Sequence, residues 1–295
     1  MSDAGLSATA SQAAADGPAG GARLPDFLVI GAQKSGSTWL VDQLTRHPDV
    51  FMAPREIHFF DQAAKFAEGL DWYARHFAKA KPGQFIGEKT PDYLLYEKAD
   101  GSRRPAPVRI HELLPEVRLL VILRNPAERA FSALRHHIWF GRLPAGEDPC
   151  ALIFGPWADK AEQWNVLSNG LYGLQLGHIF RLFGRERVRV WIFEDDVRAR
   201  PRETLREAAE FIGAATDWTP AKAGRAANRG LTRRAAFKAN QRLPALGPLW
   251  QLLDPFLGER YLLDDACRAR LMNYYADDID RLENLLGRDL SVWRG

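Results

Sequence analysis

A glycine- and serine-rich loop between a predicted strand and a predicted helix constrains the fold of this chain more than any other feature. Residues 27–30 (FLVI) form a short apolar run that stops at a glycine, which is typical of a buried parallel strand. The loop GAQKSGST follows over residues 31–38, and WLVDQL then indicates a helix that ends before Pro48. In this context backbone N–H groups and a helix N-terminus point at an anion. The sequence therefore predicts a phosphate-binding loop.

The loop differs from the P-loop of ATPases in the position of its cation. Gly31 and Gly36 have the G-x4-G spacing, but Ser37 occupies the position before Thr38 where a P-loop has lysine. The lysine lies earlier, at Lys34. Since ATPases use the later lysine on the β- and γ-phosphates and the Ser/Thr on Mg²⁺, the loop favours a nucleotide with one 5′-phosphate end and no metal. A Gly/Ser turn without a ligand is the alternative.

Strands and helices alternate along the rest of the chain. Further strands are expected at residues 50–53, 85–87, 119–123 and 188–193, and helices at 71–77, 127–140, 159–167, 171–183, 201–212 and 264–286. This order predicts an α/β fold of the P-loop-like, three-layer kind, with a central, mostly parallel sheet flanked by helices. We expect a disordered N-terminal tail at 1–24 and a single domain at 25–295, with a divergent basic and apolar insert at 218–260.

The charge balance excludes a simple nucleic-acid binder. The chain has 40 Lys and Arg against 37 Asp and Glu, which gives a net charge of +3. The positive charge is uneven, because residues 218–253 contain no acid. The two cysteines are too far apart to suggest a zinc site or a disulfide framework. Neither a transmembrane segment nor a signal peptide is indicated, so a cytoplasmic protein is expected.

Several ordered motifs resemble the sulfotransferases that use PAPS (3′-phosphoadenosine 5′-phosphosulfate). The motifs are PDFLVIGAQKSGSTWLVDQL, HPDVFMAPREIHFFD, GEKTPDYL, LLVILRNPAERAFSALRHH, GLYGLQLGHIFRLFG and WIFEDDVRARP. The chain is most similar to the glycosaminoglycan N- and 3-O-sulfotransferase domains and their bacterial relatives. The resemblance implies direct in-line transfer of a sulfuryl group from PAPS to a hydroxyl or amine, without a metal. The other product is adenosine 3′,5′-bisphosphate (PAP).

The resemblance also implies which residues bind PAPS. Lys34 stabilises the charge on the leaving phosphate. Arg124, which ends the strand at 119–123, and Ser132 in the next helix bind the 3′-phosphate. Arg129 shares the helical face of Ser132 and assists, or forms a surface salt bridge instead. The 5′-phosphate binds the backbone and hydroxyls of the loop and helix start, namely Ser35, Gly36, Ser37, Thr38 and Trp39.

A glutamate after the second predicted strand matches the catalytic base of the glycan-modifying branch. This residue is Glu56, and we expect Phe59 and Phe60 to desolvate it and raise its pKa. His58 is the rival base and otherwise an orienting histidine. Lys89 matches a position that lines the catalytic cleft and contacts the sulfonate or the acceptor; a solvated lysine is its alternative.

The chain departs from these relatives after residue 218. The relatives close their cofactor site with a disulfide-bonded hairpin and a Lys-Gly-Arg turn, for which Arg260 and Tyr261 are the nearest match here. The acid-free stretch replaces the hairpin. It could hold PAPS, attract an anionic acceptor or lie on a membrane surface, or it is a solvated basic helix with a core helix.

The acceptor is the least determined part of the prediction. The resemblance favours a carbohydrate or glycolipid, and a small-molecule or lipid natural product is the alternative. Acceptor pockets are expected from the loops at 63–70, 98–109 and 142–159. A Mg²⁺-dependent P-loop kinase or ATPase and a non-catalytic polyanion binder are the rival functions.

Overall fold

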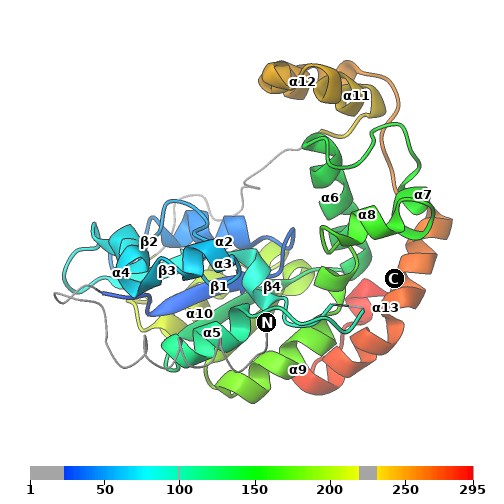
Figure 1. The fold of residues 1–295 in the computed structure, drawn as a ribbon. Helices are drawn as coiled ribbons and strands as arrows, with labels where there is room; N and C mark the ends of the chain where they lie inside the picture. The colour runs from blue at the N-terminus through cyan, green and yellow to red at the C-terminus, as the bar shows by residue number, and fades with distance from the viewer. Residues whose placement is uncertain (1–22, 99, 219–230, 295) are drawn as a thin grey trace. The chain divides into compact units, whose positions relative to one another are not determined.

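A parallel sheet of five strands forms the centre of the fold (Figure 1). The computed structural model describes residues 23–98, 100–218 and 231–294. The strand order is β2-β3-β1-β4-β5, and all four pairings are parallel. The strands are β1 (Phe27–Gly31), β2 (Val50–Met52), β3 (Phe85–Lys89), β4 (Arg118–Leu123) and β5 (Val188–Ile192). The predicted α/β class and parallel sheet are confirmed.

The chain folds as two compact units. The first comprises Met1–Arg124 and Leu174–Arg225, and the second Asn125–Gly173 and Ala226–Gly295. The first unit holds the sheet with α2 (Ser37–Leu44), α3 (Ala63–Phe66), α4 (Gly69–Ala74), α5 (Ala106–Leu113), most of α9 (Tyr172–Phe183) and α10 (Pro201–Ile212). The second holds α6 (Pro126–Trp139), α7 (Pro149–Phe154), α8 (Ala158–Glu162), α11 (Arg234–Arg242), α12 (Gly247–Leu253) and α13 (Asp265–Leu286). The single domain at 25–295 stays a prediction.

Two predicted segments fall largely or partly outside the described residues. The tail predicted at 1–24 is described only from residue 23, and the insert at 218–260 lacks 219–230. The remaining part of the insert forms α11, α12 and short turns.

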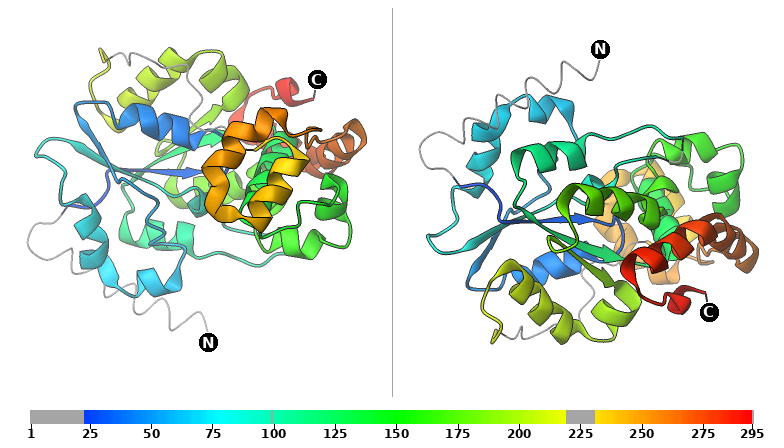
Figure 2. Two further views of the ribbon diagram at one scale, coloured as in Figure 1. Left: turned by 90° about the horizontal axis from the view of Figure 1, so that it is seen from above. Right: turned by 90° about the horizontal axis from the view of Figure 1, so that it is seen from below.

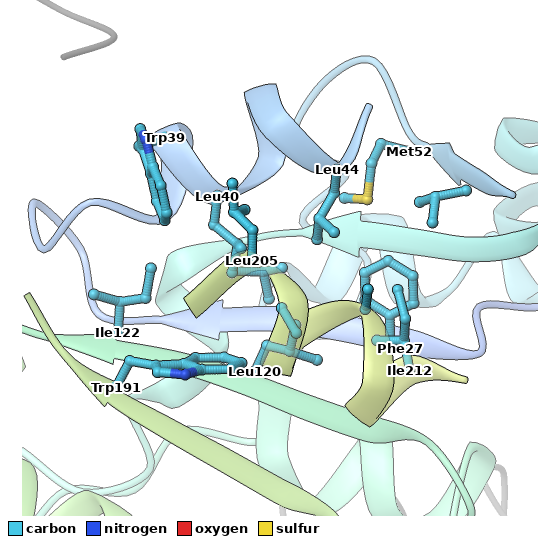
Figure 3. Close-up of a cluster of buried hydrophobic side chains, with 14 of the residues drawn as sticks. Phe27, Trp39, Leu40, Leu44, Met52, Leu120, Ile122, Trp191, Leu205 and Ile212 are labelled. Atoms are coloured by element: carbon cyan, nitrogen blue, oxygen red, sulfur yellow. The ribbon is translucent and has the colours of Figure 1, made fainter. Parts of the chain in front are cut away.

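Helices cover both faces of the sheet in the first unit. Phe27 and Val29 of β1 and the alternate residues of β4 face α2 and α10, where they form one core cluster (Figure 3). Leu28 of β1, which points the other way, is also 0% exposed. The two views of Figure 2 place α5 and α9 on that opposite face. Burial on both faces explains why these strands are continuous apolar runs.

One helix ends earlier than predicted, and one segment predicted as a loop runs into a helix, each for a local reason. The helix expected at 159–167 ends at Glu162, and Asn165 adopts a left-handed conformation with φ of 55° that a helix cannot continue through. The loop expected at 98–109 instead leads into α5, which starts next to two prolines. Proline is compatible with a first helical turn, because the N–H groups there have no intrahelical partner.

Candidate active site

The topology of the first unit brings four predicted site segments to one edge of the sheet. The phosphate loop, Glu56, Lys89 and Arg124 come at or just after the carboxyl ends of β1, β2, β3 and β4, respectively. In a parallel sheet these ends lie on the same side. The central position of β1, between β3 and β4, places the phosphate loop in the middle of this edge.

The phosphate loop has a backbone that only particular residues tolerate. Gly36 has φ of 107°, and a Cβ there would lie 2.8 Å from the ring of Phe193. Lys34 is also left-handed, with φ of 67°, which is uncommon for a residue with a side chain. Gly36 caps α2 without a side-chain hydrogen bond. Ser35 is 0% exposed, and its buried hydroxyl has no hydrogen-bond partner.

These features fit a bound phosphate. An anion at the start of α2 would accept from the N–H groups of Ser37 and Thr38, since those of Trp39 and Leu40 already bond to Gly36 O, and the buried Ser35 hydroxyl is a further potential donor. Trp39, in contrast, is 6% exposed and packs in the core cluster, as Figure 3 shows. Its predicted contact with the cofactor stays a prediction.

Phe193 connects the phosphate loop with Arg124. The Arg124 guanidinium carbon lies 5.6 Å from the centre of the Phe193 ring, the same ring that excludes a side chain at Gly36. Phe193 opens the π-helical turn after β5. Sequence reasoning missed this residue, because only the parallel pairing of β4 with β5 brings it beside Arg124.

An ion pair joins the predicted base to the phosphate loop. Lys89 Nζ lies 2.7 Å from Glu56 Oε1 and donates a hydrogen bond of 3.3 Å to Thr38 Oγ1. The Lys89 side chain is only 16% exposed, so it is not a solvated lysine. The structure therefore brings together Glu56, Lys89 and the phosphate loop.

His58 lies between two carboxylates. Its Nδ1 is 2.9 Å from Asp61 Oδ2, and its Nε2 is 3.5 Å from Glu56 Oε2. Its left-handed backbone, with φ of 59°, turns the ring toward both. Hydrogen bonds with Asp61 and Glu56 raise the pKa of His58 to about 10, although burial opposes the shift. His58 is thus protonated at neutral pH and donates from both ring nitrogens.

The expected rise in the pKa of Glu56 is wrong. Burial does raise it, but hydrogen bonds from His58 and Lys89, with their positive charges, outweigh burial and lower the pKa of Glu56 to about 2. Phe59 and Phe60 are both 0% exposed and pack with Tyr73, whereas the Glu56 side chain is 37% exposed.

A fully buried carboxyl group supports the segment that carries Glu56 and His58. Glu88 accepts hydrogen bonds from the hydroxyls of Tyr73, Thr90 and Tyr93. Thr90 Oγ1 accepts from His58 N at 3.4 Å, and Tyr93 OH accepts from Phe59 N at 2.8 Å. Burial raises the pKa of Glu88. Sequence reasoning missed Glu88, since nothing in GEKTPDYL shows which of its residues point inward.

One group of described residues has the spacing of metal ligands. His58, Asp61 and Asp92 each offer an atom within 4.8 Å of the others. His58 Nδ1 is hydrogen-bonded to Asp61, and a metal ion would have to displace the proton of that bond. Burial raises the pKa of Asp92 to about 6. The absence of a metal stays a prediction.

The other predicted cofactor residues lie in the second unit. Ser132 is half-buried on α6. Arg129 is 0% exposed and donates to the carbonyl of Val166, so the alternative of a surface salt bridge is wrong. Tyr261 is 1% exposed, stacks on Phe131 and donates its hydroxyl to Glu147 O at 3.0 Å. Arg260 is exposed. Roles of these residues in binding PAPS stay predictions.

A basic pocket of about 390 Å³ is lined in part by Arg55, the residue that precedes Glu56. Its lining is Phe51, Met52, Pro54, Arg55, Arg75, His76 and Lys79. Basic side chains with no acid among the lining residues favour an anionic ligand. The predicted acceptor loops do not include these residues, which come from β2 and the loop after it, and from the 3-10 turn after α4 and the residues that follow it.

Comparisons with known proteins agree on one family. The family model of the sulfotransferase domain matches residues 24–223. The chain is 36% identical over 173 residues to human heparan sulfate glucosamine 3-O-sulfotransferase 6, a match covering 57% of the chain and 46% of that protein. It is 27% identical over 301 residues to mouse bifunctional heparan sulfate N-deacetylase/N-sulfotransferase 4, covering 92% and 31%. The chain thus spans less than half the length of these relatives.

A solved structure shares the fold. A sulfotransferase from Alicyclobacillus acidocaldarius superposes with a TM-score of 0.69 at 24% identity, covering 92% of this chain and 100% of that one. Among the described residues, no helix is long and apolar enough to cross a membrane.

Proposed function

The chain belongs to the sulfotransferase family, and from that premise we propose that it transfers the sulfuryl group of PAPS to a hydroxyl or amine of a carbohydrate or glycolipid. One observation carries the proposal. Lys89 pairs with Glu56 and also bonds to Thr38, so the candidate base and the phosphate loop share one cation. In-line transfer needs this proximity, because the acceptor must attack the sulfur opposite the leaving phosphate.

The phosphate loop would hold the 5′ end of PAPS. The start of α2 and the Ser35 hydroxyl supply donors for its 5′-phosphate, and Lys34 stabilises the charge that develops there on transfer. Arg124, held against Phe193, is the candidate for the 3′-phosphate in the first unit. No metal is needed for these roles, because cations of the chain supply the charge.

Glu56 is the proposed general base, and Lys89 controls its strength. A carboxylate with a pKa of about 2 is ionised but weakly basic. When a sulfonate lies beside Thr38, Lys89 has a second anion within reach. A shift of Lys89 toward the sulfonate would remove a partner of Glu56 and raise its pKa. The base then becomes competent only when PAPS is bound.

His58 is proposed to orient Glu56 and to stay protonated. It has no lone pair free for the acceptor while it donates to Asp61 and Glu56. The proton of the acceptor hydroxyl or amine therefore goes to Glu56, as the new bond to sulfur forms and the bond from sulfur to the 5′-phosphate oxygen breaks.

The basic pocket at Arg55, Arg75 and Lys79 supports an anionic acceptor. Both curated relatives carry heparan sulfate, an acidic glycan, in their names. A small-molecule or lipid natural product is the alternative acceptor. Membership of the family argues against a Mg²⁺-dependent kinase and against a polyanion binder without catalysis.

A transfer screen tests the proposal. The purified chain is incubated with PAPS labelled in its sulfonate and with acidic glycans, neutral glycans, glycolipids and small hydroxylated metabolites. We expect labelled product and PAP with an acidic glycan or glycolipid, unchanged by a chelator. Turnover of ATP that needs Mg²⁺, or binding of polyanions with no PAP formed under any condition, would contradict the proposal.

A further inference from the structure

Exposed apolar side chains gather on one short stretch of the second unit. Five of the ten large apolar side chains that are exposed among the described residues lie within residues 243–256. We call them the apolar face: Leu243, Leu246, Leu249, Leu252 and Phe256, with exposed fractions of 55%, 42%, 42%, 71% and 82%. The expectation that this stretch is a core helix is therefore wrong. Such a concentration marks an interaction surface.

The apolar face is carried by a pair of helices that is anchored by hydrogen bonds to α6 and the loop after it. Figure 1 shows α11 and α12 side by side, with α11 near one end of α6. Asn240 Nδ2 donates to Trp139 O at 2.7 Å, and Gln241 Nε2 donates to Ile138 O and Leu143 O at 2.9 and 2.6 Å. On α12 itself, only Gly247 is buried. The pair of helices α11 and α12 is thus fixed through α11, while Leu249 and Leu252 of α12 point to the outside.

Within residues 231–258, which carry the apolar face, the exposed charges have one sign, whereas the loop packed against α11 has two exposed acids, Glu147 and Asp148. Lys238 and Arg242 of α11 are exposed. The one acid between residues 231 and 258 is Asp254, which is 6% exposed. Its carboxylate accepts from Thr232 N, Thr232 Oγ1 and Arg233 N, so it is directed inward. The next acid, Glu259, is exposed. A partner of this face therefore has apolar groups and negative charge.

We propose that the apolar face docks on the surface of an anionic lipid bilayer. Leucine and phenylalanine side chains enter the boundary of headgroups and acyl chains, while Lys238 and Arg242 pair with lipid phosphates. A second copy of the chain fits less well, because a twofold contact through this face would bring the same cations of both copies together. The inference does not depend on the proposed transfer reaction.

Vesicle sedimentation of the full chain tests this inference. The probes are vesicles of phosphatidylcholine alone and vesicles with about 30% phosphatidylglycerol. We expect binding to the anionic vesicles that weakens with salt, and little binding to the neutral ones. The triple substitution Leu249→Ser, Leu252→Ser and Phe256→Ser is expected to weaken binding about tenfold or more. The pair Lys238→Glu and Arg242→Glu is expected to do the same.

Matched substitutions elsewhere serve as controls. Val292→Ser removes an apolar side chain that is 43% exposed, and Arg202→Glu with Arg206→Glu reverses two exposed charges on α10. These controls should bind anionic vesicles like the parent, and all variants should melt near the parent temperature, because the changed side chains are exposed.

Three results would overturn the inference. The first is no binding of the parent to anionic vesicles at low salt. The second is a dimer in sedimentation velocity that only the apolar triple substitution dissociates, which would assign the face to a second copy. The third is equal binding by the parent and both face variants.

Discussion

At the scale of single residues, acid–base chemistry at this site is set by a row of alternating charges. Asp61, His58, Glu56 and Lys89 follow one another through contacts of 2.9, 3.5 and 2.7 Å. Asp61 and Glu56 favour the charged form of His58, and His58 and Lys89 favour the charged form of Glu56. The sequence shows Glu56 and His58 two residues apart, and the contact of His58 with Asp61, which the sequence does not show, favours Glu56 as the proposed proton acceptor.

Titration of His58 tests this row of charges. By NMR, the imidazole protons of His58 should titrate near pH 10. In Asp61→Asn the main hydrogen bond of the charged form is weakened, so the pKa of His58 should fall toward its usual 6.5. A value near 6.5 in the parent would contradict the geometry.

The same shift predicts how stability depends on pH. The pKa of His58 is higher in the folded chain, about 10, than its usual 6.5, so its contribution is complete below pH 6.5 and lost as pH rises through 10. The free energy of unfolding of the parent should therefore exceed that of His58→Gln most near pH 6, and the gap should shrink toward pH 10. Urea titrations of both proteins at several pH values measure this difference in the free energy of unfolding. A gap that widens with pH would contradict the assignment.

At the scale of elements, buried polar groups tie the loop after β2 to β3 and the turn that follows. Glu88 holds three hydroxyls, two of which hold the backbone at His58 and Phe59. The segment that carries Glu56 and His58 thus depends on a carboxyl group that is itself fully buried.

Removal of this carboxyl should be costly. Glu88→Ala leaves three buried hydroxyls without their acceptor, and each unsatisfied group costs about 1–3 kcal/mol, so we expect a loss of about 3 kcal/mol or more. Chemical denaturation measures it. Glu116→Ala, a glutamate whose side chain is 79% exposed, is the matched control and should change stability by about 0.5 kcal/mol or less. Equal effects of the two substitutions would contradict a role for Glu88.

The sequence allowed good prediction where structure is decided locally. Continuous apolar runs located β1 and β4, and helical spacing of apolar residues located α13 at Asp265–Leu286. The phosphate loop was also recognisable, because its glycines and flanking elements are contiguous. Phe193, Glu88 and the basic pocket were not, since their partners come from other strands and helices. The low pKa of Glu56 likewise depends on Lys89, which lies on a different strand.

At the scale of the whole molecule, a net charge of +3 conceals a specific distribution of cations. Lys34, Lys89 and Arg124 gather at one edge of the sheet, while Lys238 and Arg242 border the apolar face of the second unit. The near balance of charge is therefore compatible with a small polyanionic ligand in one unit and a lipid surface at the other.

The predicted contact with the 3′-phosphate involves Arg124 and Ser132. If Arg124 and Ser132 bind this phosphate, Arg124→Ala and Ser132→Ala should weaken binding of PAP about tenfold each. Neither should change binding of adenosine 5′-phosphosulfate, which lacks the 3′-phosphate. Calorimetry with both nucleotides measures this. Equal losses of affinity for the two nucleotides would show that the side chains do not bind the 3′-phosphate.

The most direct test of the account compares binding with turnover in Glu56→Gln. A general base contributes about 10²- to 10⁴-fold to the rate, whereas the phosphate loop that holds the nucleotide does not include this residue. With an acceptor from the transfer screen, we expect PAP release to fall at least about 100-fold, with the affinity for PAP measured by calorimetry unchanged within about threefold. Glu210→Gln, on the exposed surface of α10, should leave both unchanged. Full turnover in Glu56→Gln would contradict the central claim that Glu56 accepts the proton of the acceptor.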